Sequence, residues 1–307
     1  MAKTKVLITG GTGLVGKWLC TRLAEKGYTV YLLSRTKEQN TPFKVFTWDW
    51  KQQEIEVEAL ENVAYIIHLA GANIADKRWT YKRKQLLINS RVETGKLILK
   101  TLKHLQIKSK AFITASAIGY YGTITSNKIF TENDLPAKDF LGTVCNHWEQ
   151  IANGFNDLGI RVVKIRTGVV LTRQDGALSK MITPIKMGIG SALGNGKQYL
   201  PWIHIDDLCN IYIKAIEDTK MKGVYNAIAP DHKTNYVFTK TIASVLHKPF
   251  WFPNIPSFVL KLLFGELSQL LLTGSRVSSE KIISEGFCFK YSVLEKALEN
   301  LVLKETK

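Results

Sequence analysis

The sequence predicts an α/β fold, a doubly wound parallel sheet with a smaller C-terminal lobe. Two observations lead to this fold class. Short, strongly apolar segments alternate with helical patterns over the first half of the chain, and from about residue 183 the sequence becomes rich in glycine, proline and scattered aromatic residues. Strands that alternate with helices at this spacing pair in parallel through right-handed crossovers, so helices cover both faces of the sheet.

The elements follow in order along the chain. The first expected strand lies at residues 6–8, and the helix after it begins at Leu14 and ends near Gly27. Continuous apolar runs predict four more strands, at residues 28–35, 63–72, 110–122 and 160–171. The later apolar stretch 258–272 is interrupted by polar residues and is too short to span a bilayer, so we expect an amphipathic helix that packs on the domain.

Composition and charge limit the classes of partner. Of 307 residues, 45% are hydrophobic and 22% charged, as in an ordinary globular chain. The N-terminus carries no pattern typical of a secretory signal, so we expect a cytoplasmic protein without a membrane partner. The net charge of +16 raises the question of nucleic acid, but the basic residues are spread along the chain, which argues against it and favours a phosphate-bearing ligand. Four widely separated cysteines predict neither a metal site nor a disulfide framework.

A glycine pattern points to a dinucleotide. Gly10, Gly13 and Gly16 have the spacing G-x-x-G-x-x-G between a strand and a helix, which permits a tight turn, close approach of a pyrophosphate and helix packing, as in a Rossmann-type site. The second strand ends at Ser34 and Arg35, and an arginine there suits the 2′-phosphate of NADP(H) better than the ribose hydroxyl of NAD(H). This part of the predicted cofactor site comprises Gly10, Thr12, Gly13, Leu14, Val15, Gly16, Ser34 and Arg35.

Five segments taken together resemble a known superfamily. They are TGGTGLVG (9–16), HLAGANIADKRW (68–79), NSRVETGKLI (89–98), TASAIGYYG (114–122) and LPWIHIDDL (200–208). The chain resembles the extended short-chain dehydrogenase/reductases and, more narrowly, their atypical subgroup of epimerase family proteins, whose short C-terminal domain is similar to residues 252–291. The resemblance implies a Rossmann sheet with NADP(H) along the strand ends, and chemistry on a small polar substrate such as a nucleotide sugar.

The resemblance also implies further cofactor contacts and a division of the chain. Leu69, Ala70 and Gly71 would line the adenine and ribose side, Ala115 would contact the cofactor, and Arg91 would stand where relatives carry an asparagine. We assign residues 1–182 to the NADP(H)-binding domain, whose sheet can also recruit 203–228, and residues 183–307 mainly to the substrate lobe and the C-terminal domain. Whether the chain forms a homodimer stays open.

The usual catalytic residues are partly replaced. Ordinary members of the superfamily use a serine, a tyrosine as general acid/base and a lysine that lowers the pKa of the tyrosine. By resemblance Ser116 fits the serine position, with a one-residue slip left open. If Glu149 matches the usual glutamate, Leu141 replaces the tyrosine and Cys145 the lysine. Other groups that could carry a proton are Tyr120, Tyr121, Cys145, His147 and His204, and we select Ser116, Tyr120 and Cys145 as catalytic candidates.

Two functions therefore remain open. One is an NADP(H)-dependent epimerase or oxidoreductase, in which Ser116 donates a hydrogen bond to the reacting oxygen. The other is a regulatory protein that senses NADP(H) without turnover, which the loss of the tyrosine and lysine favours. The candidates for the substrate cleft are Arg78, Trp79, Lys197 and Trp202. For His204 we expect packing between the lobe and the sheet, since relatives use this segment for that purpose.

Overall fold

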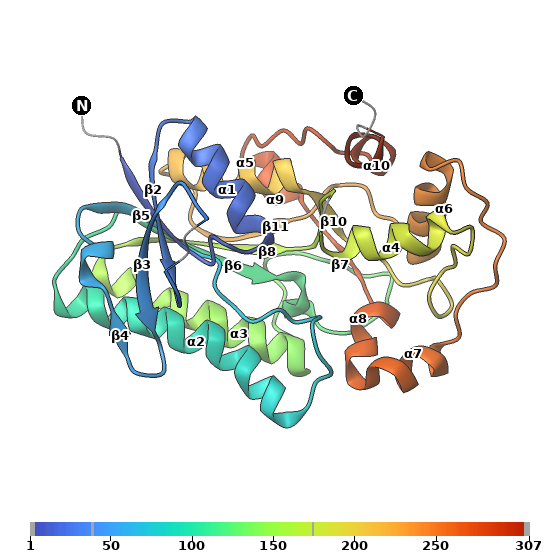
Figure 1. Cartoon of the computed structure of the whole chain (residues 1–307), viewed down its shortest axis with the longest axis horizontal. Coiled ribbons are helices and arrows are strands. Elements are labelled where there is room, and N and C mark those ends of the chain that lie inside the picture. Colours follow the sequence, from blue (N-terminus) through green and yellow to red (C-terminus); the bar gives the residue numbers. More distant parts are fainter. Residues whose placement is uncertain (1–3, 38–39, 174, 304–307) are drawn as a thin grey trace.

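A large, mostly parallel sheet runs through the centre of the computed structural model, which describes residues 4–37, 40–173 and 175–303 (Figure 1). Within these ranges eight strands are joined in the order β11-β8-β6-β5-β1-β2-β3-β4. Their bounds are β1 (Lys5–Thr9), β2 (Thr29–Ser34), β3 (Lys44–Asp49), β4 (Glu54–Ile55), β5 (Val63–His68), β6 (Ala111–Ala117), β8 (Arg161–Thr167) and β11 (Gly223–Ala227). Only the β3–β4 pair in this sheet is antiparallel among the described residues. The predicted α/β fold with a parallel sheet is confirmed.

Helices cover both faces of the sheet (Figure 1). On one face α1 (Leu14–Glu25) and α5 (Ile205–Glu217) pack on a core that includes Ile8, Ile113 and Tyr212. On the other face α2 (Tyr81–His104) and α3 (Phe140–Asn153) enclose a second core that includes Phe112 and Phe155. Because the central strands are buried on both sides, their sequences are continuously apolar rather than alternating.

The chain leaves the sheet at two points that bear on the site. After β6, the 3₁₀ turn η2 (Ile118–Tyr121) ends the predicted strand at residue 117. After β8, Gly168 separates β9 (Val169–Leu171) from the sheet, and a side chain there would meet the Pro201 carbonyl oxygen at 2.7 Å. The runs 110–122 and 160–171 therefore each contain a strand of the sheet and a second element, which is where the predicted boundaries were wrong.

The C-terminal lobe packs on its own core. Strand β9 pairs with β10 (Trp202–His204), and the helices of this core are α4 (Ala177–Lys186), α6 (Asn235–Val245) and α10 (Leu294–Val302). Two short strands, β7 (Ile129–Phe130) and β12 (Arg276–Val277), pair elsewhere in the chain. The remaining short elements are η1 (Val57–Ala59), η3 (Asn156–Leu158), α7 (Ser257–Phe264), η4 (Gly265–Ser268), α8 (Gln269–Leu272) and α9 (Glu280–Ser284).

The start of α5 fastens the lobe to the sheet. His204 is buried and its ring stacks on Tyr291 with centroids 3.8 Å apart. The buried carboxylate of Asp207 accepts hydrogen bonds from the backbone N–H groups of Lys290 (2.8 Å) and Tyr291 (2.9 Å). The expected packing role of His204 is confirmed.

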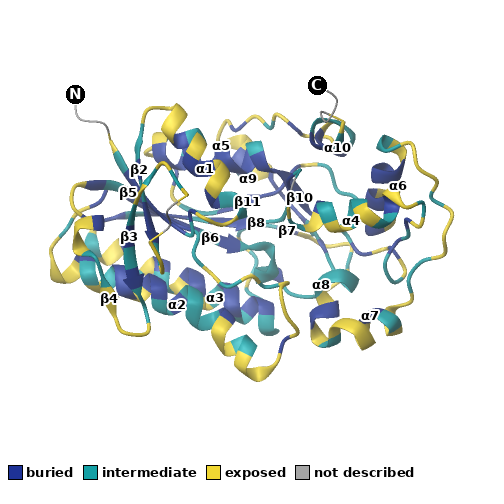
Figure 2. Ribbon diagram, viewed as in Figure 1, coloured by how far each residue is buried: buried dark blue, intermediate teal, exposed yellow. Residues whose placement is uncertain are grey.

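One helix prediction was wrong. Residues 258–272 do not form a single helix, because the chain turns at Gly265 with φ of +59° and divides into α7, η4 and α8. Most side chains of α7 face solvent instead of packing on the domain (Figure 2). Across the described ranges, no helix is both long enough and apolar enough to cross a membrane.

Candidate functional site

The glycine turn between β1 and α1 has no room for side chains at its key positions. A Cβ at Gly16 would lie 2.3 Å from the carbonyl oxygen of Gly10, and one at Gly10 would lie 2.9 Å from the Leu69 carbonyl carbon. Gly10 also has φ of +70°, which favours glycine. Glycine at these positions therefore lets α1 begin directly against β1 and lets β1 approach the end of β5.

The start of α1 is open toward solvent. Gly13 is the N-cap and supplies no side-chain cap, so the first backbone N–H groups of the helix are available to an anion. Thr12 and Gly13 are exposed, and Leu14 and Val15 are half-buried beside them. The residues predicted for the pyrophosphate thus form one continuous surface at the carboxyl end of β1, which is where ligands bind in open α/β sheets.

Arg35 stands at the edge of a surface hollow beyond β2. The hollow measures about 540 Å³, which is within the range of small-molecule sites. Arg35, Thr36 and Lys37 line one side of it, and Trp48 and Asp49 lie at the end of β3. Ser34 is the last residue of β2 and is half-buried. Asp49, Glu54 and Glu56 also line the hollow, and Lys37 lies 3.8 Å from Glu56, so of the two cations Arg35 is the one that suits a phosphate group.

The segment after β5 lies against Arg91. A Cβ at Gly71 would lie 2.9 Å from Cζ of Arg91, so only glycine allows this close contact between the loop and α2. The guanidinium stacks over the ring of Trp148 at 4.9 Å and donates to the Leu87 carbonyl oxygen (2.9 Å). Burial lowers the pKa of Arg91 to about 10, and the group stays charged at neutral pH. Leu69 and Ala70 are half-buried beside it.

His68, the last residue of β5, is buried, and both of its ring nitrogens lie within hydrogen-bond distance of threonine hydroxyls. His68 Nδ1 lies 2.8 Å from Oγ1 of Thr9, and Nε2 lies 3.3 Å from Oγ1 of Thr94. Thr9 accepts from the Ala70 N–H and can therefore donate to Nδ1, while Thr94 donates to backbone carbonyls and can accept from Nε2–H. This arrangement satisfies a neutral imidazole, and burial lowers the pKa of His68 to about 4.

We predict that His68 makes stability fall in mild acid. Its folded pKa of about 4 lies below the ordinary 6.5, so its contribution is present above pH 6.5 and is lost as the pH falls toward 4. The loss amounts to roughly 3 kcal/mol, because one pKa unit corresponds to about 1.4 kcal/mol. Urea unfolding at several pH values should show this slope, and His68→Gln should flatten it. An equal slope in both proteins would contradict the assignment.

A polar network is buried under the carboxyl ends of β6, β8 and β11. Ser116 donates to Glu149 Oε1 (2.7 Å), and Arg166 donates to both oxygens of the same carboxylate (2.7 and 2.9 Å). The third nitrogen of the Arg166 guanidinium, Nη1, donates to the Tyr121 hydroxyl (3.0 Å), which donates to Oδ1 of Asn226 (2.6 Å). All five side chains are buried. Burial alone would lower the pKa of Arg166, but the hydrogen bonds and charge of Glu149 raise it above its ordinary value.

This geometry corrects two of the catalytic predictions. The Ser116 hydroxyl is buried and donates its hydrogen bond to Glu149, so in this arrangement it is not free to donate to a substrate. Successive side chains of β6 point to opposite faces of the sheet, so Ala117 is more exposed than the buried Ser116. A shift of one residue in the match to the superfamily would therefore move the assigned serine position to the opposite face. Cys145 is also buried, and burial together with the charge of Glu149 raises its pKa to about 12. A thiolate at Cys145 is therefore excluded near neutral pH.

Tyr120 has a different environment. It is half-buried, and its ring lies 3.3 Å from Cζ of Arg166, so the cation of the network stacks on the phenol. Burial raises the pKa of Tyr120, and the charge of Arg166 partly offsets this effect. Tyr121, by contrast, is buried with its hydroxyl satisfied, and burial raises its pKa to about 12. Of these two tyrosines, Tyr120 is the one with access to solvent.

The face of α3 next to η2 carries no proton donor at the expected positions. Leu141 and Cys145 are one helical turn apart, and a Cβ at Gly119 would lie 3.3 Å from Leu141 Cβ and 3.7 Å from Cys145 Sγ. Both side chains thus lie against the turn after β6. If Glu149 matches the usual glutamate, Leu141 takes the position of the tyrosine and Cys145 that of the lysine. Leu141 belongs to an apolar cluster with Trp79 and Leu267.

The four residues predicted for the substrate cleft lie in different surroundings. Trp202 is completely buried in the lobe core, so its assignment to the cleft was wrong. Trp79 is mostly buried, donates to the Ile74 carbonyl oxygen (2.9 Å) and forms a wall beside Leu141. Arg78 is exposed and donates to carbonyl oxygens of α7, and Lys197 is exposed in a turn. The structure therefore does not gather these four into one cluster.

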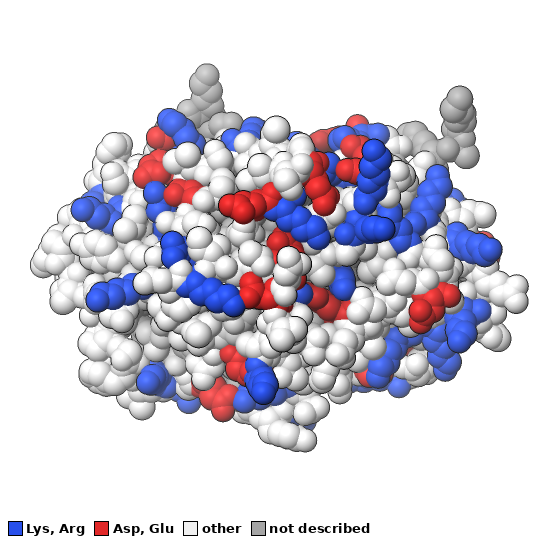
Figure 3. Space-filling view, turned by 180° about the vertical axis from the view of Figure 1, so that it is seen from behind, with Lys and Arg blue, Asp and Glu red and all other residues white. Residues whose placement is uncertain are grey.

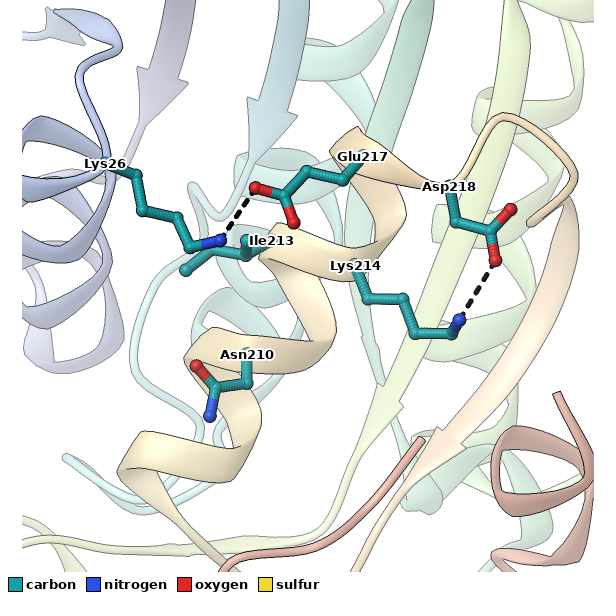
Figure 4. Close-up of a pocket in the computed structure, with 6 residues that line it drawn as sticks. All are labelled: Lys26, Asn210, Ile213, Lys214, Glu217 and Asp218. Atoms are coloured by element: carbon teal, nitrogen blue, oxygen red, sulfur yellow. Dashed lines mark hydrogen bonds and ion pairs between the residues drawn. The ribbon is translucent and has the colours of Figure 1, made fainter. Parts of the chain in front are cut away.

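A second hollow lies between helices on one face of the sheet. It measures about 440 Å³ and lies between the ends of α1 and α5 (Figure 4). Its charged side chains form ion pairs with one another, Lys26 with Glu217 (2.8 Å) and Lys214 with Asp218 (2.9 Å). It lies at the carboxyl ends of helices, away from the glycine turn, and its charges are satisfied, so we do not include it in the site.

Sequence reasoning missed Arg166 and Asn226. The available signal for Arg166 was a charged residue inside a strand that is otherwise continuously apolar, since a buried arginine requires a partner. Asn226 is the fourth residue of β11 and has no such local signal, because its partners come from other segments.

Comparison of the sequence with family models and curated proteins identifies relatives of this chain. Residues 6–227 match the model of the NAD dependent epimerase/dehydratase family, and residues 255–301 match a domain of unknown function (DUF1731). Among curated proteins, the chain is 37% identical over 299 residues to epimerase family protein YfhF of Bacillus subtilis, covering 97% of each chain. It is 35% identical over 303 residues to epimerase family protein SAR0825 of Staphylococcus aureus, covering 97% of this chain and 99% of the relative.

Solved structures that share the fold of this chain include epimerase family proteins. The human epimerase family protein SDR39U1, solved with NADPH, has a TM-score of 0.86 and 30% identity, covering 97% of this chain and 99% of that one. A nucleoside-diphosphate sugar epimerase from Corynebacterium glutamicum has a TM-score of 0.79 and 30% identity, covering 97% of this chain and 58% of that one. UDP-N-acetylglucosamine 4-epimerase from Bacillus cereus, at 18% identity and a TM-score of 0.78, shares the fold, covering 99% of this chain and 100% of that one.

Proposed function

The chain belongs to the NAD-dependent epimerase/dehydratase family, and on that premise we propose that it binds NADP(H) and acts as an oxidoreductase or epimerase on a small polar substrate. The observation that carries the proposal is the glycine turn, where Gly10 and Gly16 leave no space for a side chain and α1 begins without a cap. NADPH in the human relative of 30% identity supports the choice of cofactor.

Each part of the cofactor has a partner in this proposal. The N–H groups at the start of α1 bind the pyrophosphate, and Arg35 binds the 2′-phosphate through charge-assisted hydrogen bonds. Leu69 to Gly71 and Arg91 border the adenine and ribose side, and Ala115 lies on the strand that leads to the reacting end. The bound nicotinamide would supply or accept a hydride; the protein holds it and handles protons.

Tyr120 is the proton carrier in this proposal. It is half-buried and lies on the turn after β6. Burial raises the pKa of Tyr120, and the charge of Arg166 stacked on its ring offsets part of that rise, so the phenol is protonated at neutral pH and would act as a general acid. The buried Ser116, Glu149 and Arg166 position this turn and do not meet the substrate. A nucleotide sugar is the substrate class that the Corynebacterium relative supports, since that protein is named a nucleoside-diphosphate sugar epimerase.

A second function follows from Leu141 and Cys145. The face of α3 that points at η2 carries neither a phenol nor an ammonium group, so the usual proton relay is missing there. In this alternative the protein binds NADP(H) without turnover and the loaded state regulates a partner. It differs from the first proposal in one measurable way, which is the absence of any reaction that depends on Tyr120.

The test is a titration followed by an activity screen. NADPH and NADH are added to the protein, the seven tryptophans serving as energy donors, and the cofactors are then combined with aldehydes, ketones and nucleotide sugars while absorbance is followed. We expect tight NADPH binding and a turnover that Tyr120→Phe lowers at least about 100-fold. Binding with no turnover would favour the sensing role, and no binding of either nucleotide would refute both.

We predict that Arg35→Asp reverses the cofactor preference. The substitution removes charge-assisted hydrogen bonds to the 2′-phosphate and adds a repelling charge, whereas a carboxylate can accept from the ribose hydroxyl of NADH. The ratio of NADPH to NADH affinity should fall about 100-fold, as expected from roughly 3 kcal/mol of lost interaction. Lys100→Asp makes the same charge change at an exposed position of α2 that does not line the hollow, and it serves as the matched control. An unchanged ratio in Arg35→Asp would contradict the assignment.

A further inference from the structure

Helix α7 and the segment before it present a cluster of large apolar side chains to solvent. The exposed fractions are Trp251 70%, Phe252 37%, Phe258 69%, Leu262 75%, Leu263 57% and Phe264 37%. We call these six residues the α7 face. Single exposed apolar residues are ordinary on protein surfaces, but a group of this size on one helix and its approach marks an interaction site.

The orientation of α7 is fixed by the rest of the protein. Arg78 donates to the carbonyl oxygens of Leu262 (2.5 Å) and Leu263 (2.6 and 2.9 Å), and Lys84 pairs with Glu266 in the following turn. On the helix itself Leu260 is the residue that is buried. These contacts at the C-terminal end of α7 fix its orientation, so the side chains of the α7 face stay exposed to solvent. Rotation of α7 about its own axis would break the contacts.

The surroundings of the α7 face are basic. Lys261 is exposed on α7 itself, and residues 232–265, which lead into and form the helix, contain four lysines, of which Lys233 pairs with Asp231 (3.1 Å). The bonds of Arg78 also bring the basic segment 77–84 next to α7. The acidic residues near this junction, Asp76 and Glu266, lie within ion-pair distance of Arg83 and Lys84. In Figure 3, the view from behind, the lower left part of the molecule is mostly white with separate blue and red side chains.

We propose that the α7 face docks on a lipid bilayer that contains anionic phospholipids. Phenylalanine, tryptophan and leucine side chains enter the boundary between headgroups and acyl chains, and the surrounding lysines bind the phosphates. This combination of an apolar side with a basic rim is typical of segments that lie in a membrane surface without crossing it. A membrane-surface partner is new relative to the proposed function and does not depend on it.

The charge pattern argues against a second copy of the chain as the occupant. In a two-fold dimer each patch contacts itself, so the basic residues around one α7 face would lie close to those around the other, while Asp76 and Glu266 are already paired within the chain. The sequence alone gave no indication of a membrane because a span needs about 20 apolar residues. Surface docking needs only a short helix with its apolar side exposed.

The experiment is co-sedimentation of the full chain with vesicles of phosphatidylcholine alone or of phosphatidylcholine with phosphatidylglycerol. We expect binding to the anionic vesicles at least about tenfold above the neutral ones, weakened by salt. The double variant Phe258→Glu with Leu262→Glu should lose this binding at least about tenfold. Both side chains are largely exposed, so the variant should fold and keep the NADPH affinity of the parent protein.

The control places the same substitutions on other surfaces. Leu105→Glu with Leu135→Glu changes two exposed leucines outside the α7 face and should leave vesicle binding unchanged. Three results would overturn the proposal: no preference for anionic vesicles, an equal loss in both double variants, or a concentration-dependent dimer that only the variant of the α7 face abolishes. NADPH titration of the same proteins reports separately on the proposed function.

Discussion

Replacing Arg166 by leucine is expected to lower the free energy of unfolding by about 3–5 kcal/mol. The guanidinium is buried and makes two hydrogen bonds to Glu149 and one to Tyr121. Without it the carboxylate of Glu149 stays buried with no opposite charge, and the cost of leaving a buried ion unpaired exceeds that of losing an exposed pair. Urea unfolding monitored by tryptophan fluorescence measures the change.

The matched control is Arg22→Leu. Arg22 also pairs with a carboxylate, Asp206 Oδ1 at 2.7 Å, but its side chain is 40% exposed, so its loss should cost less than about 1 kcal/mol. Combining Arg166→Leu with Glu149→Leu should recover part of the loss, because both charges are then removed together. If Arg166→Leu proved no worse than Arg22→Leu, the network would not stabilise the fold as described.

Gly16→Ala is expected to abolish measurable NADPH binding and to lower the free energy of unfolding by about 1–3 kcal/mol. The added methyl group would lie 2.3 Å from the Gly10 carbonyl oxygen and 2.6 Å from the Gly11 Cα, both rigid backbone atoms. The start of α1 must then move away from β1, and the N–H groups that point at the pyrophosphate move with it. Fluorescence titration and urea unfolding on the same sample separate the two effects.

Gly13→Ala tests whether binding and stability respond separately. Gly13 is exposed, and a Cβ there would meet only the Gly10 carbonyl oxygen, at 3.2 Å. We expect a small change in stability but weaker NADPH binding, because the methyl group occupies the approach of the pyrophosphate.

The Gly16→Ala variant provides the outcome that would contradict the assignment. If it bound NADPH as tightly as the parent protein, the cofactor site would lie elsewhere.

The glycine turn could be predicted from sequence because its signal is local. A strand, three spaced glycines and a helix follow one another within the first 25 residues, and each is recognisable from neighbours in the chain. Strand β3, in contrast, was missed. In its sequence KVFTWD, Phe46 and Trp48 are buried while Val45, Thr47 and Asp49 on the other side are half-buried, as expected near a sheet edge, and the segment gives a weaker signal than the continuously apolar central strands.

The buried network could not be predicted because its members meet only in three dimensions. Ser116, Glu149 and Arg166 come from β6, α3 and β8, and the register that aligns Ser116 with Arg166 depends on the pairing of β6 with β8. A resemblance placed Ser116 at the end of a strand, but only the pleat decides which side the hydroxyl faces. For residues 258–272 the sequence predicted one amphipathic helix packed on the domain, whereas the turn at Gly265 and the contacts of Arg78 to the C-terminal end of α7 leave most of its side chains exposed.

The order of strands has a consequence for how the chain reaches its fold during synthesis. Strand β8 pairs with β6 on one side, while its other neighbour, β11, leaves the ribosome about sixty residues later, after most of the segment that builds β9, α4, β10 and α5. At roughly 5–20 residues per second this leaves β8 as an open edge for several seconds. An unpaired edge of this kind recruits other strands, so the nascent chain passes through an aggregation-sensitive interval that ends when β11 docks.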